Sequence, residues 1–183
     1  MKISVKSLVL GLSLACLSLA GANAAYAGPR EDKQFFDQVS GRWNGPGEII
    51  AGKYKGTKFN CDLGGSSGVK KAGMTLDGVC RVGVFTEKIT ATVEMRGGGY
   101  KGAFLDGAKG KGLDVVGGGV VGRDKAVFSL NRSKLNGSMI ARMKGDDTMV
   151  VTVSVRVEGK MIPVLGMNLT RTDGEVVGSI KTD

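Results

Sequence analysis

The sequence predicts an all-β fold, in which about ten antiparallel strands form an up-and-down meander that closes into a small barrel after a short N-terminal helix. Segments of alternating apolar and polar residues follow one another with only short turns between them, which leaves no room for crossover helices. Glycine is also abundant, with 29 residues after position 27, and glycine in strands marks the bends and bulges that a closing sheet needs. A two-layer sandwich of the same strands is the alternative.

The first 27 residues have the pattern of a cleaved secretory signal. Lys2 and Lys6 precede an apolar run of 13 residues, Leu8–Ala20, which is shorter than the roughly 20 residues that a membrane-spanning helix needs. The run is followed by Ala25-Tyr26-Ala27, a small-residue motif that predicts cleavage before Gly28. We therefore expect a periplasmic or secreted protein.

Four segments follow from this interpretation. They are the signal at 1–27, an N-terminal segment with a short helix at 28–40, the barrel at 41–173 and a C-terminal tail at 174–183. The helix is expected over Arg30–Ser40, where Phe35, Phe36 and Val39 recur at helical spacing. A lipid anchor on Cys16 is the less favoured alternative to a cleaved signal, because Ser13 stands where such a site needs an apolar residue.

The strands are expected from apolar alternation and from the glycines between segments. Their expected ranges are Arg42–Ala51, Tyr54–Leu63, Met74–Phe85, Glu87–Arg96, Tyr100–Leu105, Leu113–Val121, Ala126–Leu135, Ser138–Lys144, Met149–Val157 and Met161–Thr172. Glu158-Gly159-Lys160 predicts the turn of the last hairpin. Asn136-Gly137, a dipeptide favoured in two-residue turns, predicts the turn before Ser138.

Two cysteines lie after the predicted cleavage site. Cys61 and Cys80 are expected to form one disulfide, because a lone pair in an oxidising compartment is most simply bonded. Their positions would face each other across a hairpin whose loop is Gly64–Gly73. No CxxC spacing is present, so the predicted role of the pair is structural rather than redox or metal-binding.

The sequence contains no histidine. This excludes Ser/His/Asp and Cys/His catalysis, zinc sites with imidazole ligands and His-ligated haem. The acidic residues fall mostly near predicted turns or on outward faces, with no pair in a recognisable catalytic context. We therefore expect a protein that is not an enzyme and that holds no cofactor and no metal.

The predicted exported chain is basic, with a net charge of +7 after residue 27. A basic surface favours anionic components of a cell envelope, and Lys70 and Lys71 at a loop tip are candidate contacts for such a component. Nucleic acid is not expected, because no aromatic run accompanies the basic residues. A membrane-spanning barrel is not expected either, because aromatic residues are too few for two interfacial girdles.

Gly41-Arg42-Trp43, at the start of the first strand, resembles the G-x-W motif that opens lipocalin-type (calycin) barrels. Arg171, at the end of the last strand, stands where that superfamily has a basic residue packed across the Trp ring. The resemblance implies a structural role for Trp43 and Arg171 in closing the barrel by cation–π packing. It also implies the capacity to hold an apolar ligand, which many calycin barrels have.

The expected function is binding of a small apolar or amphipathic ligand, or of an anionic cell-envelope component. The alternative is a periplasmic inhibitor of a secreted protease or lysozyme, which would present Gly28–Lys33 to its target enzyme. The sequence does not indicate an oligomeric state.

Overall fold

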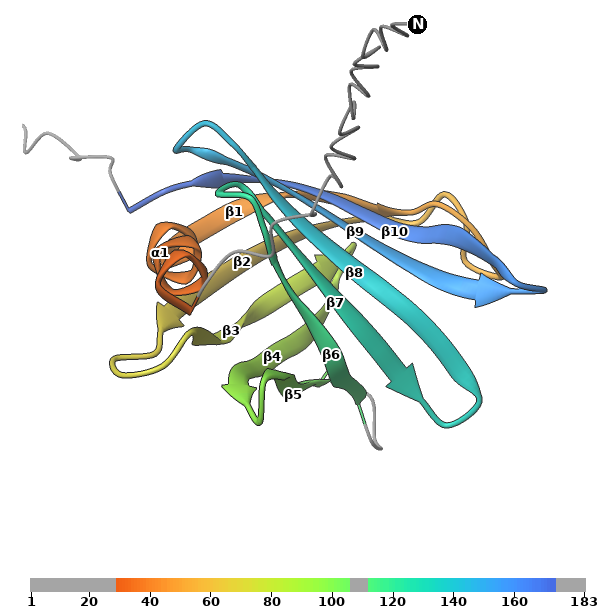
Figure 1. Cartoon of the computed structure of the whole chain (residues 1–183). Helices are drawn as coiled ribbons and strands as arrows, with labels where there is room; N and C mark the ends of the chain where they lie inside the picture. Colours follow the sequence, from red (N-terminus) through yellow and green to blue (C-terminus); the bar gives the residue numbers. More distant parts are fainter. Residues whose placement is uncertain (1–28, 106–111, 174–183) are drawn as a thin grey trace, which may run out of the picture.

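The computed structural model describes residues 29–105 and 112–173, which form one helix and ten strands (Figure 1). The elements are α1 (Pro29–Val39), β1 (Gly41–Ile49), β2 (Lys58–Ser67), β3 (Gly73–Val82), β4 (Phe85–Arg96), β5 (Gly99–Leu105), β6 (Leu113–Val121), β7 (Lys125–Arg132), β8 (Leu135–Lys144), β9 (Thr148–Val157) and β10 (Lys160–Arg171). The predicted signal and C-terminal tail lie outside the described residues.

The ten strands form one closed antiparallel barrel, which confirms the predicted fold class. Each strand pairs with the next in sequence, and β1 pairs with both β2 and β10 to complete the circle. The closing ladder places Trp43 opposite Arg171 and Gly47 opposite Met167. Closure pairs the first strand with the last, so neither presents a free edge for association with another chain.

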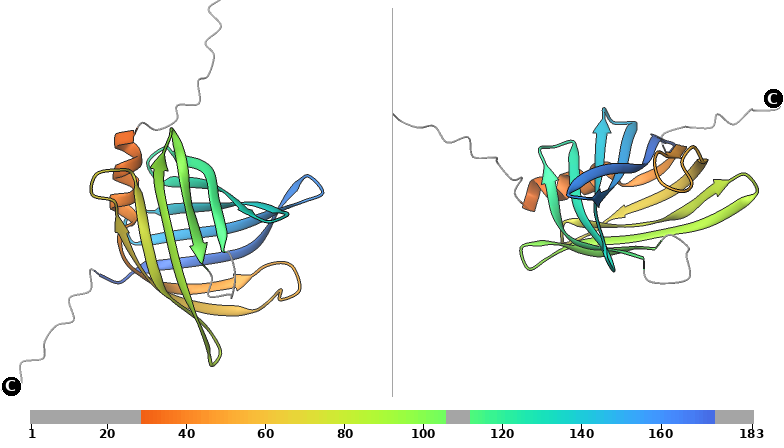
Figure 2. Two further views of the ribbon diagram at one scale, coloured as in Figure 1. Left: turned by 90° about the horizontal axis from the view of Figure 1, so that it is seen from below. Right: turned by 90° about the vertical axis from the view of Figure 1, so that its right-hand side faces the viewer.

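Helix α1 lies at one end of the barrel and confirms the short amphipathic helix predicted there (Figure 2). Phe35, Phe36 and Val39 form its buried face, and the helix packs against β2, β3 and β6. It ends where the Ser40 N–H donates to the Phe36 carbonyl and Gly41 takes a φ of 117°. Residues 29–33, which the alternative function of a protease or lysozyme inhibitor would present to a target enzyme, form the first turn of this helix.

The strand connectivity divides the turns between two ends of the barrel. The turns at 68–72, 97–98, 122–124 and 145–147 lie at the end covered by α1, which we call the helix end. The turns at 50–57, 83–84, 133–134 and 158–159 lie at the opposite end, which we call the hairpin end. In the left view of Figure 2 these last four turns lie along the side of the molecule that faces away from α1.

The predicted turn at Asn136-Gly137 is wrong, because both residues lie inside β8. The turn is at Ser133 and Lys134, and Ser133 takes the positive φ of 55° that a glycine was expected to supply. Gly137 is needed for a different reason, since a Cβ there would meet the backbone oxygen of Ser154 on β9. Asn136 pairs across the hairpin, where its side-chain oxygen accepts a hydrogen bond from Asn131 at 2.9 Å.

The boundaries of the second, third and fourth strands also differ from the prediction. The second strand begins at Lys58 rather than Tyr54, because Gly52 and Gly56 both have positive φ and prolong the turn at 50–57. It then continues to Ser67, so the predicted loop Gly64–Gly73 shrinks to 68–72. Phe85 opens β4 instead of ending β3. The turn predicted at Glu158-Gly159 is present, with both residues at positive φ.

Candidate functional site

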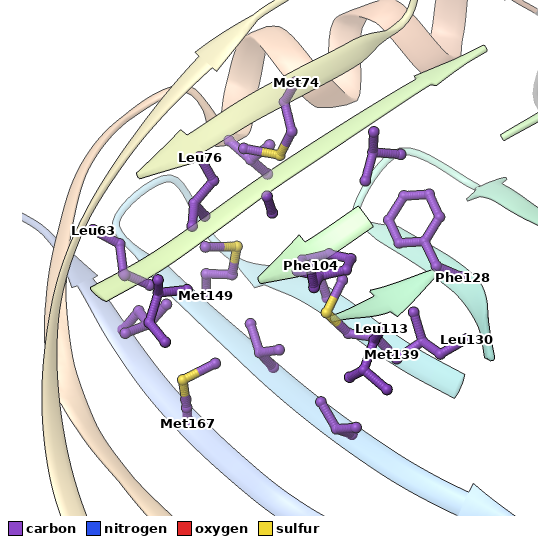
Figure 3. A pocket seen from close by; sticks show the side chains of 18 of the residues that line it. Leu63, Met74, Leu76, Phe104, Leu113, Phe128, Leu130, Met139, Met149 and Met167 are labelled. Carbon is purple, nitrogen blue, oxygen red and sulfur yellow. The ribbon is translucent and has the colours of Figure 1, made fainter. Parts of the chain in front are cut away.

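The barrel interior contains a cavity of about 180 Å³ whose lining side chains are all apolar (Figure 3). The lining residues are Phe35, Phe36, Val39, Leu63, Met74, Leu76, Ile89, Ala91, Val93, Phe104, Leu113, Phe128, Leu130, Met139, Ala141, Met149, Val151, Val153, Met167 and Leu169. In the close-up, side chains from opposite walls of the barrel point toward one another, and only carbon and sulfur atoms are drawn on them. Such a surface can make van der Waals contacts, but it has no hydrogen-bonding side chain that could orient a polar molecule.

Strand alternation explains why these residues face inward. On β4, Ala91 and Val93 line the cavity while Thr92 between them is exposed. On β9, Met149 and Val151 are buried and Val153 also lines the cavity. The inward alternation predicted for β9 therefore holds near the helix end.

The predicted inward face of β9 does not extend to the hairpin end. Val157 is 50% exposed, although it was expected on the same face as Met149. A register shift between Pro163 and Leu165 of β10 interrupts the ladder beside this part of β9. The terminal part of the β9–β10 hairpin therefore presents apolar side chains to solvent.

The cavity is closed at the helix end and more accessible toward the hairpin end. Phe35 and Phe36 of α1 are at most 2% exposed and cover the helix end. Ile89 and Leu113 line the cavity nearer the hairpin end and are only half-buried. Among the described residues, the lining contributed by α1 is therefore more deeply buried than the lining at these two positions.

Four of the lining residues are methionines, namely Met74, Met139, Met149 and Met167. Methionine is unbranched and has several rotatable bonds, so it adapts to irregular shapes. Met74 comes from β3, and the other three come from the neighbouring strands β8, β9 and β10 (Figure 3). The cavity can therefore change its shape without moving the strands.

A buried polar pair joins α1 to β5 at the helix end. The Tyr100 hydroxyl donates to Asp32 Oδ2 at 2.7 Å, and both residues are almost fully buried. Burial raises the pKa of the Asp32 carboxyl, with the hydrogen bond from Tyr100 opposing that shift and the charge of Glu31 adding to it. Burial and the neighbouring carboxylate both raise the pKa of Tyr100. The pair orients α1 over the barrel, and neither residue lines the cavity.

Trp43 and Arg171 lie together beside the C-terminal end of α1. The guanidinium carbon of Arg171 is 4.3 Å from the centroid of the Trp43 ring. Trp43 Nε1 donates to the Val39 carbonyl at 2.9 Å, and Arg171 donates to the carbonyls of Gln38 and Ser40. The carbonyls of Gln38 and Val39 are among the last of the helix and have no partner within it, so both side chains satisfy helix-end groups. This contact has the geometry that the resemblance implied, whereas membership of the lipocalin superfamily stays a prediction.

The predicted disulfide between Cys61 and Cys80 is confirmed. The two residues are direct partners in the β2–β3 ladder, and their Cα atoms are 4.0 Å apart. Cys61 is fully buried against Met167, so the bond lies inside the wall of the barrel. It links adjacent strands and does not contribute to the cavity lining.

Lys70 and Lys71 lie in the turn between β2 and β3 at the helix end. Together with Lys33 of α1 they line a shallow surface depression, which also includes Met95. Lys33 already donates to Asp37 at 2.8 Å. The sequence missed the proximity of Lys33, because a helix and a loop more than 30 residues apart meet only through the tertiary fold.

Residues 29–105 and 112–173 were compared with the requirements of a metal site and of a membrane-spanning helix. Within these ranges no three side chains of histidine, cysteine, aspartate or glutamate come together as a metal site would require. The helix described there is too short and too polar to cross a membrane.

No protein-family model matches this chain, and no curated protein matches it. Among solved structures, a protein of unknown function from the DUF3598 family of Nostoc punctiforme matches with a TM-score of 0.47 and 13% sequence identity. The match covers 75% of this chain and 49% of that chain. This chain therefore spans about half the length of that neighbour.

Proposed function

We propose that this protein is an exported, non-enzymatic carrier, periplasmic or secreted, that holds a small apolar or amphipathic molecule inside its barrel. The observation that supports the proposal is the cavity of about 180 Å³ with its wholly apolar lining. An apolar cavity of about 150 Å³ stays dry and binds small hydrocarbons, because no lining group stabilises water there. The same reasoning favours a hydrocarbon ligand here.

The size of the cavity limits the ligand. It is smaller than the roughly 300 Å³ at which pockets for drug-sized molecules begin, so we expect a single ring or a short alkyl chain to be enclosed. A polar end group would find no partner inside and would remain at the accessible hairpin end. An amphipathic molecule would therefore enter with its chain first.

Straight-chain alcohols of increasing length are suitable probes for this proposal. A ligand that binds only the folded protein raises the melting temperature as its concentration rises. The protein, expressed for export, should show such a saturable increase for some chain lengths. Native mass spectrometry after gentle purification should also show a co-purified small molecule.

A matched pair of variants separates the cavity from nonspecific binding. Ala141→Phe adds bulk inside the cavity, whereas Thr92→Phe adds the same ring to the exposed outer face of β4. We expect Ala141→Phe to abolish the increase in melting temperature and Thr92→Phe to preserve it. If no alcohol stabilises the wild-type protein and no molecule co-purifies, or if both variants bind like wild type, the carrier proposal is wrong.

A further inference from the structure

The exposed apolar side chains are concentrated at the hairpin end. Of the twelve large exposed hydrophobic residues in the described ranges, nine lie in or beside the turns at this end. They are Ile50, Tyr54, Val82, Val84, Phe85, Leu135, Val157, Met161 and Ile162. Val84, in the turn between β3 and β4, is 92% exposed, and Phe85, the first residue of β4, is 73% exposed. We call residues 50–57, 81–85, 132–135 and 156–162 the hairpin rim.

The hairpin rim is also strongly basic. It contains seven lysine and arginine residues and one acidic residue, Glu158. Counted over the turns alone, 50–57, 83–84, 133–134 and 158–159 carry three basic residues and one acidic residue, whereas the helix-end turns 68–72, 97–98, 122–124 and 145–147 carry three of each. Val69 is the one large exposed hydrophobic residue within those turns. Among the described residues, exposed apolar side chains and net positive charge are therefore both concentrated at the hairpin end.

We propose that the hairpin rim is a docking surface for a lipid bilayer that contains anionic lipids. Apolar side chains flanked by lysine and arginine are the composition that binds the boundary between headgroups and acyl chains. The charge of the rim is complementary to anionic headgroups. The proposal gives the predicted attraction to anionic envelope components a definite surface and partner, and it does not depend on the ligand of the cavity.

The arrangement of the rim favours a bilayer over a protein partner. The turns of the β3–β4 and β9–β10 hairpins lie well apart, along the side of the barrel that faces away from α1 (Figure 2). The apolar residues are thus divided among separate turns instead of forming one continuous patch. A bilayer interface accepts separate insertions at each turn, whereas a protein interface needs a packed central cluster.

Docking in this orientation would place the accessible side of the cavity against the membrane. The half-buried lining residues Ile89 and Leu113 lie toward the same end as the rim. An apolar molecule could then pass between the bilayer and the cavity with little exposure to water. Helix α1 would remain on the side away from the membrane.

Sedimentation with vesicles tests the docking surface. The protein should start at Gly28, which removes the predicted signal and retains every helix and strand described here. We expect it to sediment with vesicles of phosphatidylcholine and phosphatidylglycerol, and much less with pure phosphatidylcholine. Added salt should weaken the binding, because it screens exposed charges. Absence of binding to the mixed vesicles, or equal binding to both kinds, would overturn the proposal and direct attention to a protein partner.

Matched variants localise the binding to the rim. Val84→Glu with Phe85→Glu places two charges on the rim, and we expect at least about a tenfold loss of affinity for the mixed vesicles. Val69→Glu with Val116→Glu makes the same kind of change at exposed positions outside the rim and should have little effect. Lys53→Glu with Lys55→Glu should likewise weaken binding more than Lys70→Glu with Lys71→Glu. Equal losses within either pair would contradict the assignment.

A fluorescence measurement keeps the test independent of folding defects. Phe85→Trp should show a blue shift of emission when mixed vesicles are added, whereas Val69→Trp should not. The native Trp43 is 1% exposed and gives the same background in both variants. Rim variants should bind straight-chain alcohols like wild type, and Ala141→Phe should still bind vesicles. The docking proposal and the carrier proposal can therefore fail separately.

Discussion

At the residue scale, Arg171 connects three parts of the chain at the helix end. Its guanidinium packs on Trp43 of β1 and donates to the carbonyls of Gln38 in α1 and of Ser40 just after it. Its Nε donates to the Asp146 carbonyl in the β8–β9 turn. Each hydrogen bond contributes modestly by itself. Removing the Arg171 side chain would therefore leave several carbonyl groups without a hydrogen-bond donor at the same time.

We expect Arg171→Ala to lower the free energy of unfolding by about 2–4 kcal/mol, through the lost ring contact and the unsatisfied carbonyls. Urea unfolding followed by circular dichroism would measure it. Arg42→Ala is the control, because Arg42 is exposed and forms only a surface ion pair with Asp62, worth about 0–1 kcal/mol. Equal effects of the two substitutions would show that the Arg171 contacts add no more than a surface charge does.

Asp32 and Asp37, both on α1, are expected to affect stability with opposite dependence on pH. Burial raises the pKa of Asp32, so ionising it destabilises the folded state as pH rises from about 3.8 through the raised value. Hydrogen bonds from Lys33 and Ser67 lower the pKa of Asp37. The stability that Asp37 contributes is therefore present above pH 3.8 and is lost as pH falls through the lowered value.

Urea unfolding between pH 3 and pH 7 would measure these effects. Asp32→Asn keeps an oxygen acceptor for Tyr100 and removes the buried charge, so its stability relative to wild type should increase with pH. Asp37→Asn should become less stable relative to wild type over the same range. Parallel curves for the two variants would contradict this account of the two carboxyl groups.

At the scale of elements, the β2–β3 hairpin depends on a covalent link as well as on its ladder. Cys61 and Cys80 are 19 residues apart in sequence and directly opposite in the ladder. A cross-link over a loop of this length restricts the unfolded chain, which stabilises the folded state by about 3 kcal/mol. The hairpin would keep its register without the bond, because the ladder on both sides is continuous.

We therefore expect Cys61→Ala with Cys80→Ala to unfold at a lower urea concentration, by an amount that corresponds to about 3 kcal/mol. Treating the wild-type protein with a reducing agent should produce a similar loss. Straight-chain alcohols should still bind, since neither cysteine lines the cavity. A loss well below 1 kcal/mol in both experiments would show that the disulfide is not a significant source of stability.

At the scale of the whole molecule, α1 both completes the core and limits the cavity. Phe36 is 1% exposed, lines the cavity and contacts the rings of Tyr100 and Phe128, whose centroids are 5.6 and 6.4 Å away. The same side chain therefore contributes to stability and determines how far the cavity extends toward the helix end.

Phe36→Ala should lower the free energy of unfolding by about 3–5 kcal/mol, which is typical of a buried aromatic residue truncated in a core. It should also shift the preferred alcohol to a longer chain, because the cavity gains volume at its closed end. Thermal unfolding with the alcohol series measures both effects. If the variant is destabilised but keeps the wild-type preference for chain length, Phe36 does not limit the ligand.

Local patterns in the sequence were enough to predict the fold class, the Cys61–Cys80 pair and the approximate positions of the strands, with β2 shifted by four residues. These predictions succeeded because apolar alternation, the glycines between segments and the spacing of the cysteines are local patterns, and because each strand pairs with the next one in sequence. The Asn136-Gly137 prediction failed for a physical reason, since Gly137 serves close contact with Ser154 on a neighbouring strand. A local turn signal cannot distinguish that requirement from a turn.

Three features could not be predicted from local patterns: which apolar residues enclose a cavity, that Asp32 contacts Tyr100, and that most exposed apolar residues lie at one end. These features depend on closure of the barrel between β1 and β10 and on the position of α1 over one opening. Whether an interior is filled or hollow depends on small differences between side-chain volumes and barrel width, which are set by register and packing over the whole molecule. Alternation in the sequence indicates that a side chain points inward, but it does not indicate which side chains or empty space it faces.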